Sequence, residues 1–250
     1  PMEQTVLTLD PLTGIAHAEM NWKKGKYSVW TPEHPTLIHF GIYTRNKGRL
    51  ALLYTTKTAI RTVSVSKEKG FQLNGVSRKI QGVCLHHDLG PLGAAENKAA
   101  LIRQIKQMKD MGADAIRTAH NMPSELFVHL CDSLGMMIMA ESFDMWLYPK
   151  CKNGYARFFK DWSDKDMENL IRHHRNHPSI VMWSIGNEIP EQWNKEGAAR
   201  AKVMTEYCHE LDDTRPVTCG GDNPKANTEC GFFAALDVPG FNYRVHLYDE

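Results

Sequence analysis

The sequence lacks the features of several specialised classes of protein. Its 250 residues carry a formal net charge of only +1, so no strong field draws nucleic acid or an anionic membrane to it. It contains no apolar run of about 18 residues, the length needed to cross a bilayer. No basic segment followed by an apolar one marks a signal peptide. We therefore predict neither nucleic acid nor membrane as a partner, while association into a homo-oligomer stays open.

Cysteine is also sparse, and its pattern gives no sign of a metal site. The six cysteines form no CxxC pair, which favours free, mostly buried thiols over the alternative of a disulfide framework. No spacing of cysteine and histidine fits zinc, and His173 and His174 are interpreted as a solvated pair favoured by a helix dipole. We predict no metal and no cofactor. The compartment stays open between the cytoplasm and a bacterial periplasm.

Residues 1–77 have the pattern of β structure. Short runs rich in β-branched and aromatic residues, separated by Gly, Asn and Pro, cover residues 27–30, 36–40, 49–54 and 61–65. Short strands at such regular spacing are typical of an antiparallel sandwich. Four strands are too few for a complete sandwich, so we expect part of this domain to precede the sequence.

From residue 78 onward, strand patterns alternate with helix patterns. Helices are predicted at residues 98–111, 161–174 and 196–211, and another is capped by Ser124 and closed by Gly135. Buried parallel strands are predicted at residues 79–85, 115–117, 136–140, 180–185, 216–219 and 238–241. Repeated βα units of this kind build either a doubly wound sheet or a barrel.

The positions of polar residues favour the barrel. Polar side chains follow successive strand ends, at residues 117–120, 141–144, 187–188 and 242–243. Several strands contribute to one rim in a TIM barrel, whereas a doubly wound sheet has one switch point and a GxGxxG turn, which is absent. We predict an α/β fold, a (β/α)8 TIM barrel. Because six strands do not close it, we expect the barrel to be incomplete at the C-terminus.

The clearest chemical signal is the pair Asn187 and Glu188 at the exit of an apolar strand. Glycoside hydrolysis needs a carboxylic acid that protonates the leaving oxygen. It also needs a neutral group beside the sugar 2-hydroxyl, whose hydrogen bond strengthens in the transition state. Asn187 and Glu188 suit these two roles. By itself an Asn-Glu dipeptide is more often part of an exposed loop, so the interpretation depends on its context.

Four further stretches supply that context. They are Trp30 to Pro35, Phe71 to Gly75 followed by Ile80 to Val83, Arg117 to Pro123, and Gly186 to Glu188. On these stretches, in this order, the chain resembles glycoside hydrolase family 2, and its β-galactosidases most closely. The resemblance covers nearly the whole chain. It implies a partial immunoglobulin-like β-sandwich over residues 1–77 and strands 1 to 6 of a catalytic TIM barrel over residues 78–250.

The resemblance also implies a retaining exo-β-glycosidase, most like a β-galactosidase, that acts on an oligosaccharide or other glycoside by double displacement. Glu188 is its expected acid/base, Asn187 holds the sugar 2-hydroxyl, and Tyr243 hydrogen-bonds the nucleophile. The nucleophilic glutamate has no counterpart here, and Glu250, only seven residues after Tyr243, is not assigned to the role. The 250-residue chain alone is therefore expected to be inactive.

Other residues are expected to line the sugar pocket. The resemblance implies His120, Asp144 and Trp146, with Trp146 as a stacking wall for one face of the sugar. In the segment from His86 to Asp88, neighbouring side chains on an extended backbone point to opposite faces. We therefore interpret this segment as contributing one barrel-facing His or Asp near the sugar pocket, with Asp88 as the assigned residue, and not a metal site.

Arg117 and Glu141 are predicted to support the site. Arg117 could contact substrate, or form a buried ion pair with Glu141 or Glu188. Alternative interpretations make His120 a helix cap, and Trp146 and Tyr243 packing residues. For the activity, the alternatives are a β-glucuronidase or β-mannosidase of the same family, or a sugar-binding fragment that does not turn over substrate.

Overall fold

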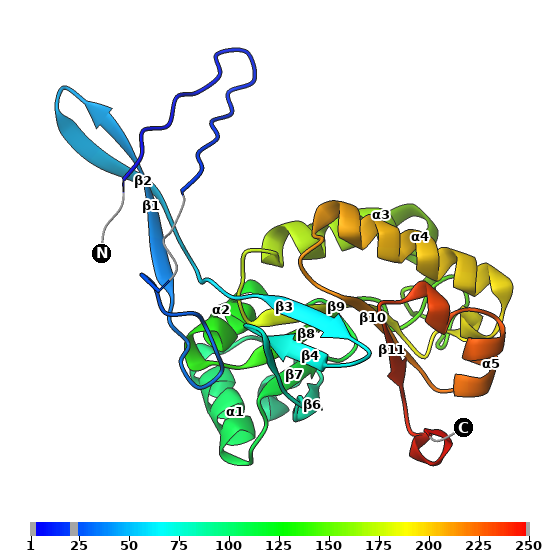
Figure 1. Ribbon diagram of the computed structural model, residues 1–250. Helices are drawn as coiled ribbons and strands as arrows, with labels where there is room; N and C mark the ends of the chain where they lie inside the picture. The colour runs from blue at the N-terminus through cyan, green and yellow to red at the C-terminus, as the bar shows by residue number, and fades with distance from the viewer. Residues whose placement is uncertain (1–3, 21–24, 249–250) are drawn as a thin grey trace.

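The computed structural model describes residues 4–20 and 25–248. Its main unit is a six-stranded parallel sheet in the order β11-β10-β9-β8-β7-β6 (Figure 1). Every strand pairs with its neighbours in sequence, so the sheet forms a half-barrel and has no switch point. The predicted α/β barrel class is confirmed. The strands are β6 (Gly82–Leu85), β7 (Ala115–Thr118), β8 (Met137–Glu141), β9 (Ile180–Asn187), β10 (Val217–Gly221) and β11 (Val238–Phe241).

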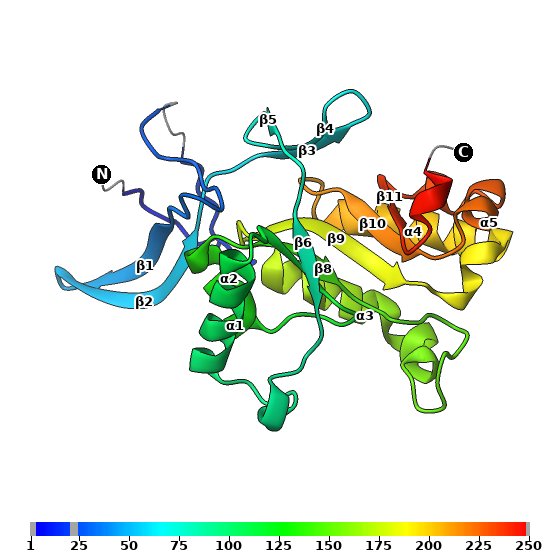
Figure 2. The ribbon, with the colours of Figure 1, turned by 90° about the horizontal axis from the view of Figure 1, so that it is seen from below.

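Helices follow the strands, with α1 and α2 near β6 to β8 and α4 and α5 near β10 and β11 (Figure 2). Several begin at a side-chain cap, as where Ser124 Oγ accepts a hydrogen bond from the Phe127 amide. The α-helices are α1 (Lys98–Asp110), α2 (Glu125–Leu134), α3 (Ala156–His174), α4 (Lys195–Leu211) and α5 (Pro224–Glu229). Short 3₁₀ turns are η1 (Gly90–Leu92), η2 (Pro190–Trp193), η3 (Phe233–Ala235) and η4 (Val245–Leu247).

The core is centred on β9, in which all eight residues are buried. A strand covered on both faces must be apolar along its length, which is why residues 180–185 gave so clear a signal. Helix α3 begins five residues before its predicted start because Phe159 packs in the core against Phe143 and Trp146. His174, predicted to be solvated, is instead buried at the end of this helix, so that prediction is wrong.

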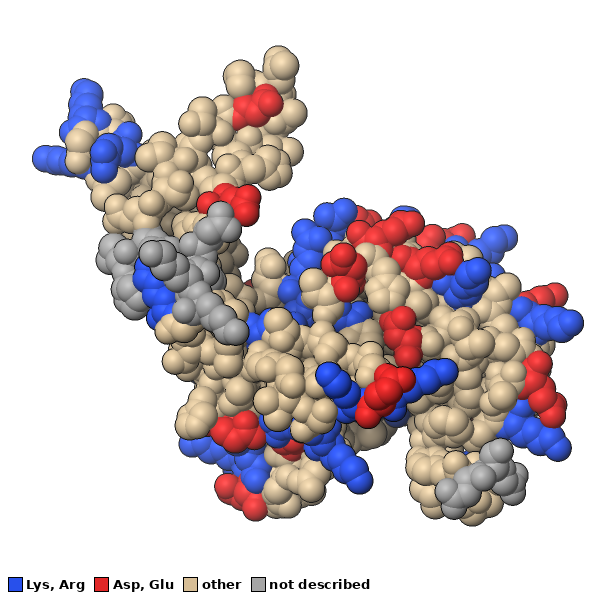
Figure 3. Space-filling model, in the orientation of Figure 1, with Lys and Arg blue, Asp and Glu red and all other residues tan. Residues whose placement is uncertain are grey.

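The N-terminal residues form small antiparallel sheets. A hairpin of β1 (Ile38–Asn46) and β2 (Arg49–Thr58) projects from the body, and β3 (Val63–Ser66), β4 (Gly70–Leu73) and β5 (Val76–Ser77) form a separate sheet (Figure 1). Figure 3 shows Lys and Arg gathered at the hairpin tip, while both signs of charge mix over the body. The immunoglobulin-like assignment and the domain boundary after residue 77 stay predictions.

Trp30 joins this N-terminal region to the half-barrel. Residues 27–30, predicted as a strand, have no strand structure. The Trp30 side chain is instead completely buried in the core. It packs with Leu73, Ala115, Met137 and Val181, and its indole Nε1 donates to the Asp132 carbonyl at 2.9 Å. Arg61 fixes the same end of the sheet by donating to the carbonyls of Pro178 and Ile180.

Candidate active site

The carboxyl ends of the parallel strands bring the predicted polar residues together. Arg117 is on β7, Glu141 ends β8, Asn187 ends β9, and Glu188 follows directly. Because all six strands run the same way, these side chains meet at one rim of the half-barrel. The site described below is this rim.

Glu141 is the buried anchor of the rim. Its side chain is completely buried, and Oε2 accepts hydrogen bonds from Arg117 Nε at 2.7 Å and Ser184 Oγ at 2.6 Å. Its other oxygen, Oε1, lies 2.6 Å from His120 Nδ1. Burial acts to lower the pKa of Arg117, but the Glu141 carboxylate outweighs it and the net change is upward. Arg117 and Glu141 therefore form an ion pair, and both carboxylate oxygens of Glu141 are already occupied.

Arg117 extends this network to Asn187. Its Nη2 donates to Asn187 Oδ1 at 2.8 Å, and Asn242 Nδ2 donates to the same oxygen at 3.1 Å. Two donors on one oxygen fix which way the amide is turned. The Nδ2 group of Asn187 then faces Asp144 Oδ1, at 3.3 Å.

Asp144 is held by Lys150 from the loop after β8. Lys150 Nζ donates to Asp144 Oδ1 at 2.8 Å and to the Asn187 carbonyl at 2.6 Å. Partial burial acts to raise the pKa of Asp144, but the hydrogen bond and charge of Lys150 outweigh it and hold the pKa below its ordinary value. Asp144 is therefore an anion at neutral pH, beside the Asn187 amide.

Glu188 is half-buried beyond the end of β9. Its backbone adopts φ +44°, and its amide donates to the Gly220 carbonyl at 2.7 Å. The carboxylate Oε1 accepts a hydrogen bond from Asn242 Nδ2 at 2.7 Å. Tyr243 is 79% exposed, and the Glu188 carboxylate raises the pKa of its hydroxyl by its charge and by a hydrogen bond. Glu188 is thus oriented by neutral groups and is not engaged in an ion pair among the described residues.

Gly220 on β10 leaves room for this network. A Cβ atom at this position would lie 2.9 Å from Arg117 Nη2, 3.1 Å from Asn242 Nδ2 and 3.2 Å from Asn187 Oδ1. Any larger residue would push these side chains apart. The absence of a side chain on β10 is therefore part of the geometry of the rim.

Two predicted pocket residues lie elsewhere. Trp146 is completely buried, donates from Nε1 to the Ile185 carbonyl at 2.9 Å and stacks on Phe159, so its predicted role as a stacking wall is wrong. The loop after β8 carries the indole into the hydrophobic core, where it also contacts Phe232. Asp88 lies in an exposed turn, where its Oδ1 accepts from the Gly90 amide at 2.7 Å.

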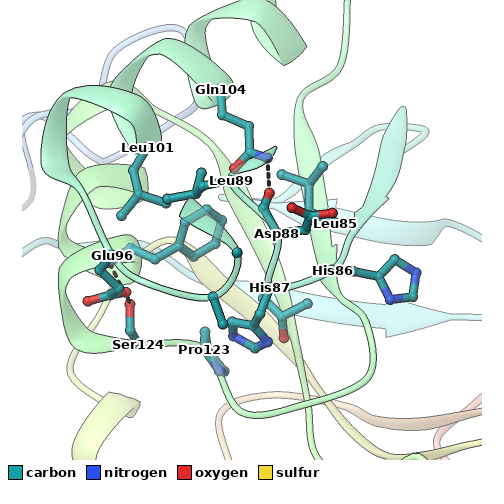
Figure 4. Close-up of a pocket in the computed structure, with 14 residues that line it drawn as sticks. Leu85, His86, His87, Asp88, Leu89, Glu96, Leu101, Gln104, Pro123 and Ser124 are labelled. Atoms are coloured by element: carbon teal, nitrogen blue, oxygen red, sulfur yellow. Dashed lines mark hydrogen bonds between the residues drawn. The ribbon is translucent and has the colours of Figure 1, made fainter. Parts of the chain in front are cut away.

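His86 contacts the rim in place of Asp88. Its ring packs edge-on against His120, with centroids 5.2 Å apart. With His87 and Asp88, His86 also lines a pocket between β6, α1 and α2 (Figure 4). His120 is not a helix cap, because Ser124 caps α2 and His120 contacts Glu141.

Sequence reasoning missed two members of the network, Ser184 and Lys150. It placed Asn242 at the rim, directly after the last strand, but gave it no role. Ser184 and Lys150 had no such signal, because an inward-facing serine in a strand and a lysine in a loop are both common. Within the described residues, no cluster of histidine, cysteine, aspartate and glutamate side chains at this rim has the spacing of a metal site. The cluster that has this spacing, His129, Asp132 and His177, lies elsewhere.

A parallel half-barrel with carboxylate and amide side chains along its carboxyl rim has the architecture of a TIM barrel enzyme. Residues 63–240 match the TIM barrel domain of glycosyl hydrolases family 2. The chain belongs to this family of glycoside hydrolases.

Relatives with assigned names agree on the family. Over 221 residues the chain is 41% identical to Beta-galactosidase BoGH2A of Bacteroides ovatus, covering 76% of this chain and 26% of that protein. It is 37% identical over 215 residues to a putative β-glucuronidase of Formosa agariphila, covering 86% of this chain and 19% of that protein. The chain thus spans about a quarter or less of the length of these curated relatives.

Solved structures agree on the fold. A glycosyl hydrolase family 2 member from Bacteroides cellulosilyticus superposes with a TM-score of 0.82 at 37% identity, covering 88% of this chain and 28% of that chain. A β-glycosidase from Bacteroides vulgatus superposes with a TM-score of 0.74 at 38% identity, covering 86% of this chain and 26% of that chain.

Proposed function

We propose that the protein containing this chain is a retaining exo-β-glycosidase with Glu188 as its general acid and base. The observation that carries this proposal is the setting of Glu188. Its half-buried carboxylate follows β9, accepts from Asn242 at 2.7 Å and adjoins Asn187. A carboxyl group partly shielded from water and oriented by neutral groups can exchange a proton with a bound substrate.

The proposed reaction is a double displacement. Glu188 donates its proton to the glycosidic oxygen while a second carboxylate attacks the anomeric carbon from the opposite face. The aglycone leaves as an alcohol, and a covalent glycosyl-enzyme remains. Glu188 then takes a proton from water as the water attacks the same carbon, which restores both carboxyl groups and retains the configuration.

The second carboxylate is not Glu141, because its oxygens are occupied by Arg117, Ser184 and His120. We assign the nucleophile to strands that would complete the barrel beyond the six described here, about 5–5.5 Å from Glu188. Tyr243 is exposed beside Glu188 and is suited to hydrogen-bond such a nucleophile.

The remaining rim residues are proposed to bind the sugar or to support the site. Asn187 offers its Nδ2 group to the sugar 2-hydroxyl, since its oxygen is held by Arg117 and Asn242. Asp144 and His120 are proposed to bind other hydroxyls. Arg117 and Glu141 position these groups without contacting the reacting atoms.

β-Galactosides are the substrates we propose. The supporting observation is the 41% identity to a protein named a β-galactosidase. The alternative is a β-glucuronidase, supported by relatives that carry this name at lower identity. Assays with matched β-galactoside, β-glucuronide and β-mannoside substrates distinguish these activities.

The test is Glu188→Gln in the complete protein. The turnover rate of the variant on alkyl glycosides, which need protonation of the leaving oxygen, should fall by at least about 10³-fold. Aryl glycosides with acidic phenols should keep a larger share of the glycosylation rate. Added azide should accelerate release of the sugar and form a β-glycosyl azide, because a small anion needs no general base.

The matched control is Glu196→Gln, an exposed residue in the first turn of α4, which should leave every rate unchanged. Near-normal hydrolysis of alkyl glycosides by Glu188→Gln would remove Glu188 from the proposed role.

A further inference from the structure

A second cluster of ionisable side chains lies at the opposite end of β9 from Glu188. His129, Asp132 and His177 each bring one possible ligand atom within 4.8 Å of the others. His129 and Asp132 are three residues apart on α2 and so share one face of that helix. His177 lies in the loop between α3 and β9. We propose that these three residues bind a divalent metal ion of the zinc class.

The contacts within the cluster suit a metal ligand set. His177 Nδ1 lies 2.5 Å from Asp132 Oδ2, and Asp132 Oδ1 accepts from the Ser179 amide at 3.0 Å. A metal ion would replace the proton between His177 Nδ1 and Asp132 Oδ2, because a neutral imidazole with its proton on Nε2 offers Nδ1 as a ligand beside the carboxylate oxygen. His129 faces the same imidazole edge-on, with ring centroids 4.6 Å apart. Two imidazoles and one carboxylate, with water as the fourth ligand, form a common zinc set.

Burial gives this cluster a closed side and an open side. The side chains of Asp132 and His177 are 2% and 8% exposed, whereas that of His129 is 44% exposed. An ion can therefore enter past His129 and meet two ligands that are already fixed by packing. Glu125, one turn earlier on α2, has Oε1 3.4 Å from His129 Nε2 and can orient that ring from outside.

His174 supplies an independent observation beside the cluster. It is buried, and its Nδ1 atom has no hydrogen-bond partner among the described residues. Its ring centroid lies 5.6 Å from that of His177.

The nearby guanidinium groups are occupied. Arg215 pairs with Asp212 and donates to the His177 carbonyl at 2.9 Å, and Arg61 donates to the Pro178 and Ile180 carbonyls. Neither forms an ion pair with Asp132 among the described residues. No lysine or arginine of the described residues forms an ion pair with Asp132, so a bound cation would pair with its carboxylate directly.

The position of the cluster defines its role. An eight-residue strand spans about 26 Å, so an ion at the start of β9 is remote from Glu188 at its end. The proposed ion joins α2 to the loop that leads into β9. It should stabilise the fold and take no part in bond cleavage.

The experiment compares metal binding by the complete protein and its variants after treatment with EDTA. In a calorimetric titration, the wild type should bind one equivalent of Zn²⁺ more than His129→Gln does. Zn²⁺ should also raise the Tm of the wild type by a few degrees more than it raises the Tm of this variant. Co²⁺ should give a visible absorption band that weakens at least about tenfold in the same variant. His129 is half exposed, so its replacement should not prevent folding.

His173→Gln is the matched control, because His173 is an exposed histidine at the adjacent end of α3. It should titrate like the wild type. Identical Zn²⁺ titrations for the wild type and His129→Gln would overturn the proposal. Asp132 and His177 would then be a hydrogen-bonded pair that holds no ion. Because hydrolysis does not enter this comparison, its outcome is independent of the proposed glycosidase function.

Discussion

At the scale of single residues, Asn242 links two members of the rim, although the sequence analysis gave it no role. One amide group, Nδ2, donates to both Glu188 Oε1 and Asn187 Oδ1. Replacing Asn242 by Ala removes this bridge and leaves both side chains free to turn. We expect kcat/KM to fall about 10- to 100-fold, the equivalent of one or two hydrogen bonds to a charged group. The measurement is hydrolysis of an activated β-glycoside, with unfolding monitored separately.

Asn153→Ala is the control for this change, since Asn153 is exposed in the loop before α3. It should leave kcat/KM unaltered. A rate for Asn242→Ala equal to that of the wild type would mean that Glu188 does not need the bridge.

His174 makes stability depend on pH. Burial and the neighbouring His177 lower its pKa from 6.5 to about 4, so between these values the unfolded chain binds the proton more readily. The stabilisation is fully present above pH 6.5 and is lost as the pH falls towards 4. By linkage it amounts to at most about 3 kcal/mol.

Urea unfolding of the complete protein at pH 7 and pH 4.5, with EDTA present, measures this contribution. His174→Gln cannot titrate, so its free energy of unfolding should fall less between the two pH values. The exposed His173→Gln should retain the full wild-type dependence. Parallel pH dependence in the wild type and His174→Gln would show that the proton is taken up elsewhere.

At the scale of elements, α2 offers a direct test of local stabilisation. Ser124 Oγ accepts from the Phe127 amide at the start of the helix and also donates to Glu96. Ser124→Ala should lower the free energy of unfolding by about 1 kcal/mol, the usual effect of losing an N-cap. Ser133→Ala, an exposed position near the end of the same helix, should be close to neutral. Equal effects in urea unfolding would contradict a capping role.

The elements that sequence predicted well are those set by local rules. Caps such as Ser124, the closing Gly135 and the apolar run of β9 each act over a few residues, and the structure has them at those positions. Trp146 and His174 were misjudged because their burial depends on segments that are distant in sequence. The segment that contains Trp30 was wrongly predicted as a strand for the same reason, because Trp30 packs between the N-terminal sheet and the parallel sheet.

The rim could be predicted only in part. Rim membership was predictable for Arg117, Glu141 and Asn187, because strand ends in a parallel sheet meet at one edge. The pairing of these side chains across that edge was not predictable. The possible partners of Arg117 were Glu141 and Glu188, and only the three-dimensional register of β7, β8 and β9 selects Glu141.

At the scale of the whole molecule, the half-barrel has two open edges. The order of the sheet leaves β6 and β11 each with one strand neighbour among the described residues. Unpaired strand edges and exposed apolar residues promote association between chains. We expect the 250-residue chain, expressed alone, to be oligomeric or to aggregate, and to hydrolyse no activated β-galactoside.

Light scattering after size exclusion, together with the hydrolysis assay, tests this expectation. A monodisperse monomer with strong turnover that disappears on Glu188→Gln would contradict it. A second carboxylate within these residues would then act as the nucleophile, and the buried Glu141 would have to be released from Arg117 to do so.

Because Gly220 has no side chain, polar groups from three other residues can pack together over β10. Arg117, Asn187 and Asn242 surround that position so closely that a methyl group there would lie 2.9 to 3.2 Å from their polar atoms. If the proposed function is right, a sugar ring would rest on this polar layer and would not descend between the strands. The strands would then set the depth of the reaction, and we expect the loops above them to select the sugar. Exchanging those loops should alter which sugar is accepted, while the glycosidic bond should still be cleaved at the same depth above the strands.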